Sequence, residues 1–428
     1  MTVAIGPQVT ESTLPNGARL FVSEQRNVPM VVVQVMVDAG SRRDPQGEGG
    51  LANLTAELLT EGTSTRDAAA ISEAVDNLGA SLGAGASMDY GSVSLRVLAK
   101  DFDAGLDLLA DVLVRPTFPE AEVVRRKEAV LAGIRARRDD PNDVAEKAFQ
   151  VALFDGEPYG HPVEGTEETL RRIGRADVQA FYRRAYQPGR ALVVVVGDVA
   201  ADDARRRIES ALATWTGAGE APFEYPPAPE PQARTVRIDK PVTQTSIILG
   251  QRGIARDNPD YEALSVMNYM LGGGGFSSRL MASIRTEAGL AYSVGSFFTV
   301  NSAPGSFQII MQTKNATVAE AVTRARREVE RIRAEPVRDD ELAEAKRYLT
   351  GSFALKLDSN TKIAQFIAQA VFFGLGVDYA EVYLQRVNAV TTDDVLRVAR
   401  QYLHPEQFIE VIVGDLTQSA APDTGAAH

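Results

Sequence analysis

Two segments of the chain carry side chains whose types and spacing suit chemistry, and the first is GEGGLANLTAELLTEGTSTRD at 47–67. Asn53 and Glu57 stand four positions apart, so they share one face of the helix that the leucine spacing predicts. Two good ligands at this spacing can grip a metal ion. An amide is a poor zinc ligand, so these residues alone favour a solvated polar face of an amphipathic helix.

The second segment is LGGGGFSSRLMASIRTEAGLAYSV at 271–294, in which Arg285 precedes Tyr292 by seven positions. A guanidinium can hold a carbonyl or carboxylate through its fork of donors, and a tyrosine hydroxyl can donate to a developing oxyanion. Such a pair suits peptide-bond cleavage, which passes through a tetrahedral centre. Gly289 is suited to end the helix so that the chain turns into a strand. In an arbitrary sequence the pair would instead be a helix cap and a strand aromatic.

The same segment opens with four glycines, Gly272, Gly273, Gly274 and Gly275. Two interpretations are open: a flexible loop whose exposed backbone binds an extended peptide, or a tight turn between two helices. A phosphate-binding loop is disfavoured because no strand precedes the glycines and no Lys-Ser or Lys-Thr pair follows them.

Both segments resemble the inverted zinc peptidases, which include insulinase, pitrilysin and the mitochondrial processing peptidase. That family carries H-x-x-E-H in a frame like G-L-A-H-x-x-E-H-x-x-x-x-G-T, which here reads GLANLTAELLTEGT. Asn53 and Glu57 stand at the two histidine positions, Ala56 at the catalytic glutamate, and Gly133 at the third ligand. The resemblance therefore implies that this chain holds no zinc and has no base to activate water.

The second segment resembles the family's second-half signature closely. The resemblance implies that Arg285 and Tyr292 reach the substrate near the zinc. It also implies a substrate-binding role for the glycines 272–275, because the non-catalytic subunit of mitochondrial processing peptidase uses a longer glycine-rich loop at this point. In the family, a strand corresponding to part of 79–97 offers its edge to substrate.

The elements that must position these residues occur twice. DVQAFYRRAYQPGRALVVVVGDV (177–199) aligns without a gap with DVLRVARQYLHPEQFIEVIVGDL (394–416), at an offset of 217 residues. Each copy reads as a helix, a proline stop and a buried strand that ends in Gly-Asp. We therefore expect a tandem duplication, with domains at 1–216 and 234–428 and a Pro/Gly/Ala-rich linker at 217–233.

Hydrophobic periodicity predicts an α+β fold, in which each domain packs helices mainly on one face of a mixed or antiparallel sheet. In the first half the pattern predicts strands at 28–41 and 91–99 and helices at 49–61, 67–79, 101–114 and 119–138. In the second half it predicts strands at 242–250, 291–300 and 305–314 and helices at 259–271, 277–287, 315–334 and 338–357.

Composition narrows the function further. The chain of 428 residues has no cysteine, which excludes thiol catalysis, disulfides and cysteine zinc sites. Its formal net charge of −12 gives no reason to expect nucleic acid or an anionic membrane as a partner. No apolar run approaches the length of a membrane span, and the N-terminus lacks a secretion signal. We expect a cytoplasmic protein, or a periplasmic one if a signal has been removed.

These observations lead to one functional hypothesis and an alternative. The chain is expected to be the zinc-free subunit of a heterodimeric zinc metalloendopeptidase, inactive when isolated, that supplies Arg285 and Tyr292. Its expected partner is a homologous subunit that carries H-x-x-E-H and the zinc, and its expected substrate is a peptide. The alternative is a non-enzymatic scaffold or peptide-holding member of the same family.

Overall fold

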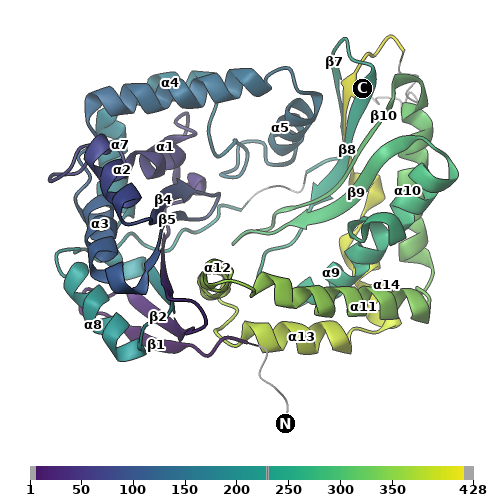
Figure 1. Ribbon diagram of the computed structural model, residues 1–428. Coiled ribbons are helices and arrows are strands. Elements are labelled where there is room, and N and C mark those ends of the chain that lie inside the picture. Colours follow the sequence, from purple (N-terminus) through teal and green to yellow (C-terminus); the bar gives the residue numbers. More distant parts are fainter. Residues whose placement is uncertain (1–5, 228, 230, 419–428) are drawn as a thin grey trace. The chain divides into compact units, whose positions relative to one another are not determined.

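The computed structural model describes residues 6–227, 229 and 231–418, and the chain forms two compact units (Figure 1). One unit consists of Met1–Arg135, His161–Tyr225 and Phe353–Glu381, and the other of Ala136–Gly160, Pro226–Ser352 and Val382–His428. Each unit is built on a single sheet, six-stranded in the first and five-stranded in the second. The predicted α+β fold with two duplicated domains is confirmed.

The sheet of the first unit is mixed, because only β2 and β6 run parallel. In sheet order its strands are β1 (Thr10–Thr13), β2 (Arg19–Glu24), β6 (Leu192–Gly197), β3 (Met30–Val37), β5 (Gly91–Leu98) and β4 (Ser81–Ala86). Side chains alternate between its two faces, so Val31, Val33 and Val35 enter one core while Val32 enters another. Both faces of this sheet are therefore apolar.

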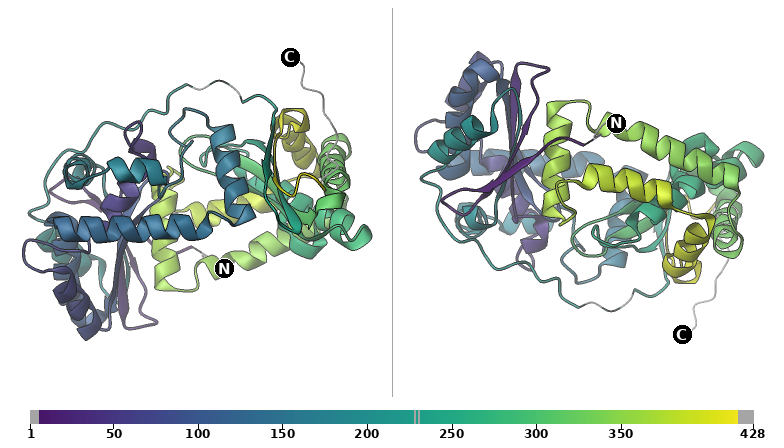
Figure 2. Two further views of the ribbon diagram at one scale, coloured as in Figure 1. Left: turned by 90° about the horizontal axis from the view of Figure 1, so that it is seen from above. Right: turned by 90° about the horizontal axis from the view of Figure 1, so that it is seen from below.

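Most helices of the first unit share the larger of these two cores. They are α1 (Leu51–Leu58), α2 (Ala68–Asn77), α3 (Phe102–Val114), α4 (Glu120–Arg137), α6 (Glu167–Arg172), α7 (Arg175–Ala185) and α8 (Ala201–Ala211). The other face is covered by α12 (Asn360–Phe372), as Figure 2 shows. Ile363, Ile367 and Val371 of this helix belong to the same core cluster as Phe21 of β2. This helix comes from the second half of the chain.

The sheet of the second unit repeats this plan. In sheet order its strands are β7 (Thr235–Asp239), β11 (Ile409–Gly414), β8 (Gln244–Arg252), β10 (Ser306–Lys314) and β9 (Ala291–Thr299), and only β7 and β11 run parallel. Its helices include α9 (Tyr261–Asn268), α10 (Val318–Ala334), α11 (Asp339–Phe353), α13 (Tyr379–Ala389) and α14 (Thr392–Tyr402). Contacts of α9 and α10 with α14, and of α10 with β10, build a helical layer beside the sheet.

One further helix of this unit, α5 (Pro141–Leu153), comes from the first half of the chain and packs against β8 and β11. Phe149 of α5 is buried directly over Gly250, where an added Cβ would come within 2.5 Å of the ring. The compact units thus depart from the expected domains 1–216 and 234–428, because each half contributes one helix to the other unit. No helix or strand interrupts the described part of the linker between α8 and β7.

The internal repeat is visible in the elements themselves. Helix α14 and strand β11 begin and end 217 positions after α7 and β6. Asp177 and Asp394 cap these helices alike, accepting from the backbone N–H of Gly174 at 2.8 Å and of Thr391 at 2.9 Å. The alignment of these two aspartates therefore has a physical cause, since each satisfies a free donor at a helix start.

Candidate functional site

The first candidate segment forms α1, whose N-terminus is held by a buried carboxylate. Asp44 accepts hydrogen bonds from the backbone N–H groups of Gly50 at 2.8 Å and Ala52 at 2.7 Å. Gly50 has a φ of +99°, and an added Cβ would come within 2.7 Å of the carbonyl oxygen of Glu164. Burial raises the pKa of Asp44 to about 7, against the two backbone donors that favour its charged form. The start of α1 is thus set by a glycine and by a carboxyl group that sequence analysis missed.

The expected polar face of α1 is present, but its residues bind one another. Asn53 donates to the Oε1 atom of Glu57 at 3.1 Å. Ala56, at the aligned position of the catalytic glutamate, is fully buried and offers no polar group to this face. The polar interaction along this face is therefore an amide–carboxylate hydrogen bond.

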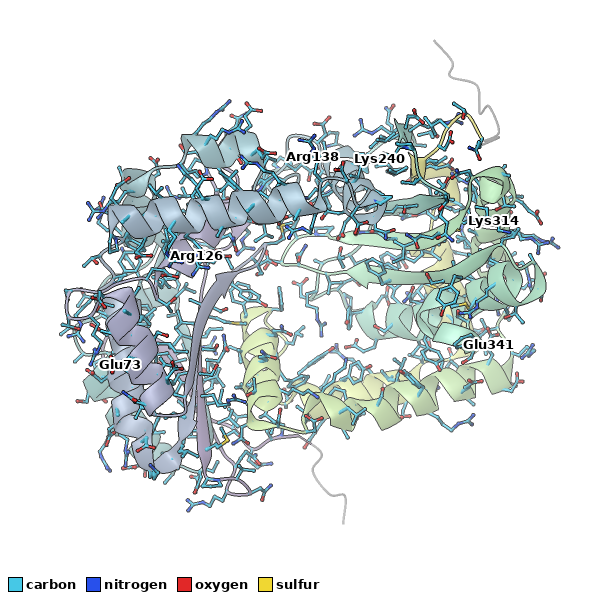
Figure 3. All side chains as sticks on the ribbon, turned by 45° about the horizontal axis from the view of Figure 1, so that its top comes forward. Glu73, Arg126, Arg138, Lys240, Lys314 and Glu341 are labelled. Carbon is cyan, nitrogen blue, oxygen red and sulfur yellow. The ribbon has the colours of Figure 1, made fainter. Side chains whose placement is uncertain are left out.

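The neighbouring helix α4 presents an arginine to this face. Arg126, labelled on α4 in Figure 3, has its Nε atom 3.9 Å from Glu57 Oε2. Arg126 also pairs with Glu61, a nearly buried residue just beyond α1, and Arg125 binds the other oxygen of Glu61. Two carboxylates and two guanidinium groups therefore balance one another between α1 and α4.

The residues at the four aligned positions do not fit a zinc ion. Gly133 lies on α4 seven positions after Arg126, about two helical turns along the same face, and it offers no ligand atom. Asn53 is engaged with Glu57, and Glu57 has a guanidinium beside it. A zinc site needs at least three nitrogen, oxygen or sulfur ligands from the protein. Across the described ranges, no group of three or more His, Cys, Asp or Glu side chains is placed to hold a metal.

The second candidate segment lies in the second unit and brings Arg285 and Tyr292 together. Arg285 stands in a π-helical turn, Met281–Glu287, and Tyr292 is the second residue of β9. Gly289, at a φ of +62°, ends the turn, and its N–H donates to the carbonyl of Arg285 at 3.0 Å. The guanidinium carbon of Arg285 lies 4.7 Å from the centroid of the Tyr292 ring. The predicted helix, stop and strand therefore place these two side chains in contact.

A β-bulge explains why Tyr292 stands free of the sheet. Thr313 pairs with Ala291 and Met311 pairs with Val294, so β9 has one residue more than β10 at this point. Tyr292 is 80% exposed. Among the described residues, neither its hydroxyl nor the side chain of Arg285 forms a hydrogen bond or ion pair. Both groups can therefore receive a ligand without breaking an internal bond.

Arg279 shows the opposite behaviour six positions earlier in the same segment. It forms a bidentate ion pair with Glu341 of α11, at 2.7 and 2.8 Å, and both side chains are largely buried (Figure 3 labels Glu341). Arg279 thus fastens the segment to α11, and the unpaired state of Arg285 is not a general property of this region.

The glycine-rich turn is tightly packed over most of its length. An added Cβ would meet the backbone nitrogen of Ser296 at 2.5 Å from Gly272, Asn268 Nδ2 at 2.9 Å from Gly273, and the carbonyl of Tyr269 at 2.7 Å from Gly274. Gly275 meets nothing within 4 Å but has a φ of +59°. All four glycines thus have a local structural reason, and their binding to a peptide stays a prediction.

This turn also carries a residue that sequence analysis passed over. Phe276 follows the last glycine and is 73% exposed, and its ring centroid lies 4.7 Å from the guanidinium carbon of Arg285. The side chain of Arg285 therefore contacts two aromatic rings that come from different elements. An exposed phenylalanine on a glycine turn was a visible signal, but its contact depends on the fold of the turn.

Profiles of known protein families match both halves of the chain. The insulinase profile of peptidase family M16 matches residues 20–167, and the profile of the M16 inactive domain matches residues 172–349. An uncharacterized zinc protease of Streptomyces coelicolor is 30% identical, over 94% of this chain and 89% of the relative. The uncharacterized zinc protease YmxG of Bacillus subtilis is 27% identical, over 94% of this chain and 97% of the relative.

Solved structures agree with these profiles. The crystal structure of a peptidase M16 inactive domain from Pseudomonas fluorescens is 31% identical, with a TM-score of 0.92, covering 97% of this chain and 99% of that one. A protease from Helicobacter pylori, at 23% identity and a TM-score of 0.88, shares the fold over 95% of this chain and 99% of that one. No helix in the described part of the chain combines the length and apolar character needed to cross a membrane. The chain belongs to the insulinase family of peptidases, family M16.

Proposed function

We propose that this chain is the zinc-free subunit of a heterodimeric zinc metalloendopeptidase. In this proposal a homologous H-x-x-E-H subunit supplies the zinc and the base, and this chain supplies Arg285 and Tyr292. The observation that carries the proposal is the contrast between the two segments. At the metal positions, Glu57 is bound by Asn53 and has Arg126 beside it. By contrast, Tyr292 is exposed, Arg285 is half-buried, and neither side chain forms a hydrogen bond or ion pair with another described residue.

Each of the two side chains suits one part of peptide-bond cleavage. The five N–H donors of the Arg285 guanidinium would hold a carbonyl or carboxylate of the peptide in place. The Tyr292 hydroxyl would donate a hydrogen bond to the oxygen that becomes negative in the tetrahedral intermediate. Removal of one such donor typically lowers the rate by about 10²–10³. The partner's metal and base would supply the activated water, because Ala56, at the aligned position of the base, cannot accept a proton.

The glycine-rich turn contributes to this proposal through its exposed part. Gly273 and Gly275 are exposed, whereas Gly272 is buried against β9. An extended peptide would therefore meet the backbone of Gly273 and Gly275 first, with Gly272 and Gly274 shaping the turn.

The proposal is tested by measuring peptide hydrolysis and zinc content for three samples: this chain, its H-x-x-E-H homologue, and their mixture. Only the mixture should cleave peptides. Arg285→Ala or Tyr292→Phe in this chain should lower the kcat of the mixture by at least about a hundredfold. Matched controls are Arg338→Ala and Tyr348→Phe, which alter exposed side chains elsewhere in the second unit and should leave the rate unchanged.

Two outcomes would replace the proposal. If the isolated chain binds stoichiometric zinc and cleaves peptides, the interpretation of Asn53, Ala56, Glu57 and Gly133 is wrong. If no complex forms and no sample containing this chain gains activity, the chain is a non-enzymatic scaffold or peptide holder.

A further inference from the structure

Phe276 occupies a position that is unusual for a large apolar side chain. Its ring is 73% exposed, although the turn around it is well held. The buried hydroxyl of Ser278 donates to the carbonyl of Gly275 at 2.7 Å, and Ser277 donates to the carbonyl of Gly274 at 3.3 Å. The turn thus has its own hydrogen bonds and does not need the ring for its stability.

The main described interaction of this ring is with Arg285. The guanidinium carbon of Arg285 lies 4.7 Å from the Phe276 centroid and 4.7 Å from the Tyr292 centroid. Both distances fall within the range in which a cation is attracted to the face of an aromatic ring. Attraction to a ring face uses the positive charge and no conventional hydrogen bond, so the N–H groups of Arg285 stay available to a ligand.

This arrangement addresses a difficulty that an unpaired arginine poses. A free arginine side chain has many rotamers, and a ligand that uses it must first restrict them. Arg279 avoids this cost through its ion pair with Glu341, but such a pair would occupy the donors that Arg285 needs. Two rings can restrict the guanidinium without using any of its hydrogen-bond donors.

We propose that Phe276 is a positioning residue that holds the Arg285 guanidinium against Tyr292, ready for a peptide carbonyl or carboxylate. Phe276 acts through Arg285 and needs no contact with the reacting atoms. The proposal rests on the proposed function for its catalytic consequence, while the placement of Arg285 can be tested without any partner.

The placement is tested in the isolated chain by the rate at which phenylglyoxal modifies Arg285, followed by mass spectrometry after chymotryptic digestion. Arg205 is the internal reference, because it is exposed and has neither a ring contact nor an ion pair with any described residue. Phe276→Leu should raise the rate at Arg285 about fivefold, the factor that corresponds to a cation–π contact of about 1 kcal/mol. Phe276→Tyr should keep the slow rate, and the rate at Arg205 should stay constant throughout.

The catalytic consequence is tested in the mixture with the zinc-bearing homologue. Phe276→Leu should lower kcat about fivefold with KM within about twofold, and Phe276→Tyr should restore it. The control is Leu355→Ala, which truncates an exposed apolar side chain in the first unit and should change neither rate.

The outcomes separate this proposal from the proposed function. If the unaltered mixture is inactive, the proposed function fails, and the modification rates still decide whether Phe276 holds Arg285. An unchanged rate at Arg285 in Phe276→Leu overturns the proposal. So does a kcat that stays within twofold of the unaltered value while Arg285→Ala abolishes activity.

Discussion

Arg126 places a positive charge where the aligned family frame has metal ligands on α1 and α4. It lies 3.9 Å from Glu57, pairs with Glu61, and stands seven positions before Gly133 on the same helix. A cation at this place opposes the binding of a divalent metal even after the ligands are restored. Restoring the motif by Asn53→His, Ala56→Glu, Glu57→His and Gly133→Glu should therefore give weak zinc binding. Adding Arg126→Ala should raise the zinc content to ~1 ion per chain.

The measurement is zinc content by atomic absorption after dialysis, with circular dichroism to show that each variant is folded. The matched control adds Arg125→Ala in place of Arg126→Ala, because Arg125 pairs with Glu61 but has no contact with Glu57. Equal zinc binding with Arg126 present or absent would show that this charge is irrelevant to the site.

The family resemblance implied that Arg285 and Tyr292 act at one place, and the helix, the stop at Gly289 and the strand between them are local features that the sequence could predict. The contact between Phe276 and Arg285 depends on the fold of the glycine-rich turn, in which three glycines are tightly packed and Gly275 has a positive φ. Residue spacing does not reveal this fold.

The contacts of Arg126 with Glu57 and Glu61 could not be predicted either, because the sequence of a charged helix does not show which carboxylates of another element lie opposite it. Residues that act through another element are the ones sequence pattern alone misses.

Helix α1 begins at a carboxyl group whose ionisation should make the stability depend on pH. Burial raises the pKa of Asp44 to about 7, so the folded protein binds a proton there that the unfolded chain has already lost. The free energy of unfolding should therefore fall as the pH rises from about 4 to about 7, by up to about 4 kcal/mol. Asp44→Asn cannot ionise and should remove this slope, at a cost of about 1–3 kcal/mol for the donor it leaves poorly paired.

Urea unfolding at pH 5 and pH 8 measures this slope, because the interval covers most of the titration of Asp44. Asp415→Asn is the control: it removes an exposed carboxylate whose pKa is lowered by a hydrogen bond from Thr417, so it titrates below the interval. A slope for Asp44→Asn that equals that of the unaltered chain would show that Asp44 titrates normally.

The repeated helices α7 and α14 should depend equally on their first-turn aspartates. Asp177→Ala and Asp394→Ala each remove the acceptor for a free backbone N–H, and each should cost about 1 kcal/mol. Because hydrogen bonds from Thr391 lower the pKa of Asp394, its contribution is present above about pH 4 and is lost as the pH falls through the folded-state pKa. Urea unfolding at pH 7 should show two similar losses that add in the double variant, and a loss at only one site would argue against equivalent caps.

Hydrophobic periodicity predicted most of the central helices and strands, and the elements it missed or misplaced have identifiable physical causes. Predicted strands at 91–99 and 305–314 match β5 and β10, and predicted helices at 67–79 and 101–114 match α2 and α3. The predicted helix at 259–271 instead ends at Asn268, and the π-helical turn Tyr269–Gly273 follows because of the packed glycines. β1 (TEST) contains no apolar residue, and β7 (TVRID) is only five residues long with two apolar side chains that are half-buried, so both were missed.

At the scale of the whole molecule, the halves of the chain do not coincide with the compact units. The first half sends α5 to the second sheet, where Phe149 packs over Gly250, and the second half sends α12 to the first sheet. No local pattern predicts which sheet a helix covers, since an amphipathic helix has the same sequence whichever partner it meets. The expected boundaries at 1–216 and 234–428 follow from the internal repeat. A repeat shows which segments arose by duplication, and it does not show which sheet each helix packs against.

This exchange of helices should make the two halves depend on each other for folding. A fragment 1–216 lacks the helix that covers Phe21, Val32 and Val194, and a fragment 234–428 lacks Phe149. Exposing such buried apolar side chains costs about 1.5–3 kcal/mol each, which is large beside the net stability of a domain. Each fragment expressed alone should therefore aggregate or bind a hydrophobic dye, whereas co-expressed fragments should elute together from a sizing column.

A protease site inserted in the linker 217–233 provides the matched test on an already folded chain. After cleavage the two pieces should remain associated and should separate only when urea unfolds them, because each sheet is still covered by the other piece's helix. Linker composition alone would suggest two domains that part freely once the tether is cut. Separation under native conditions, with cooperative unfolding of each piece, would mean that α5 and α12 contribute little to the sheets they cover. Retained association would mean that duplication here produced one mutually dependent protein and not two tethered ones.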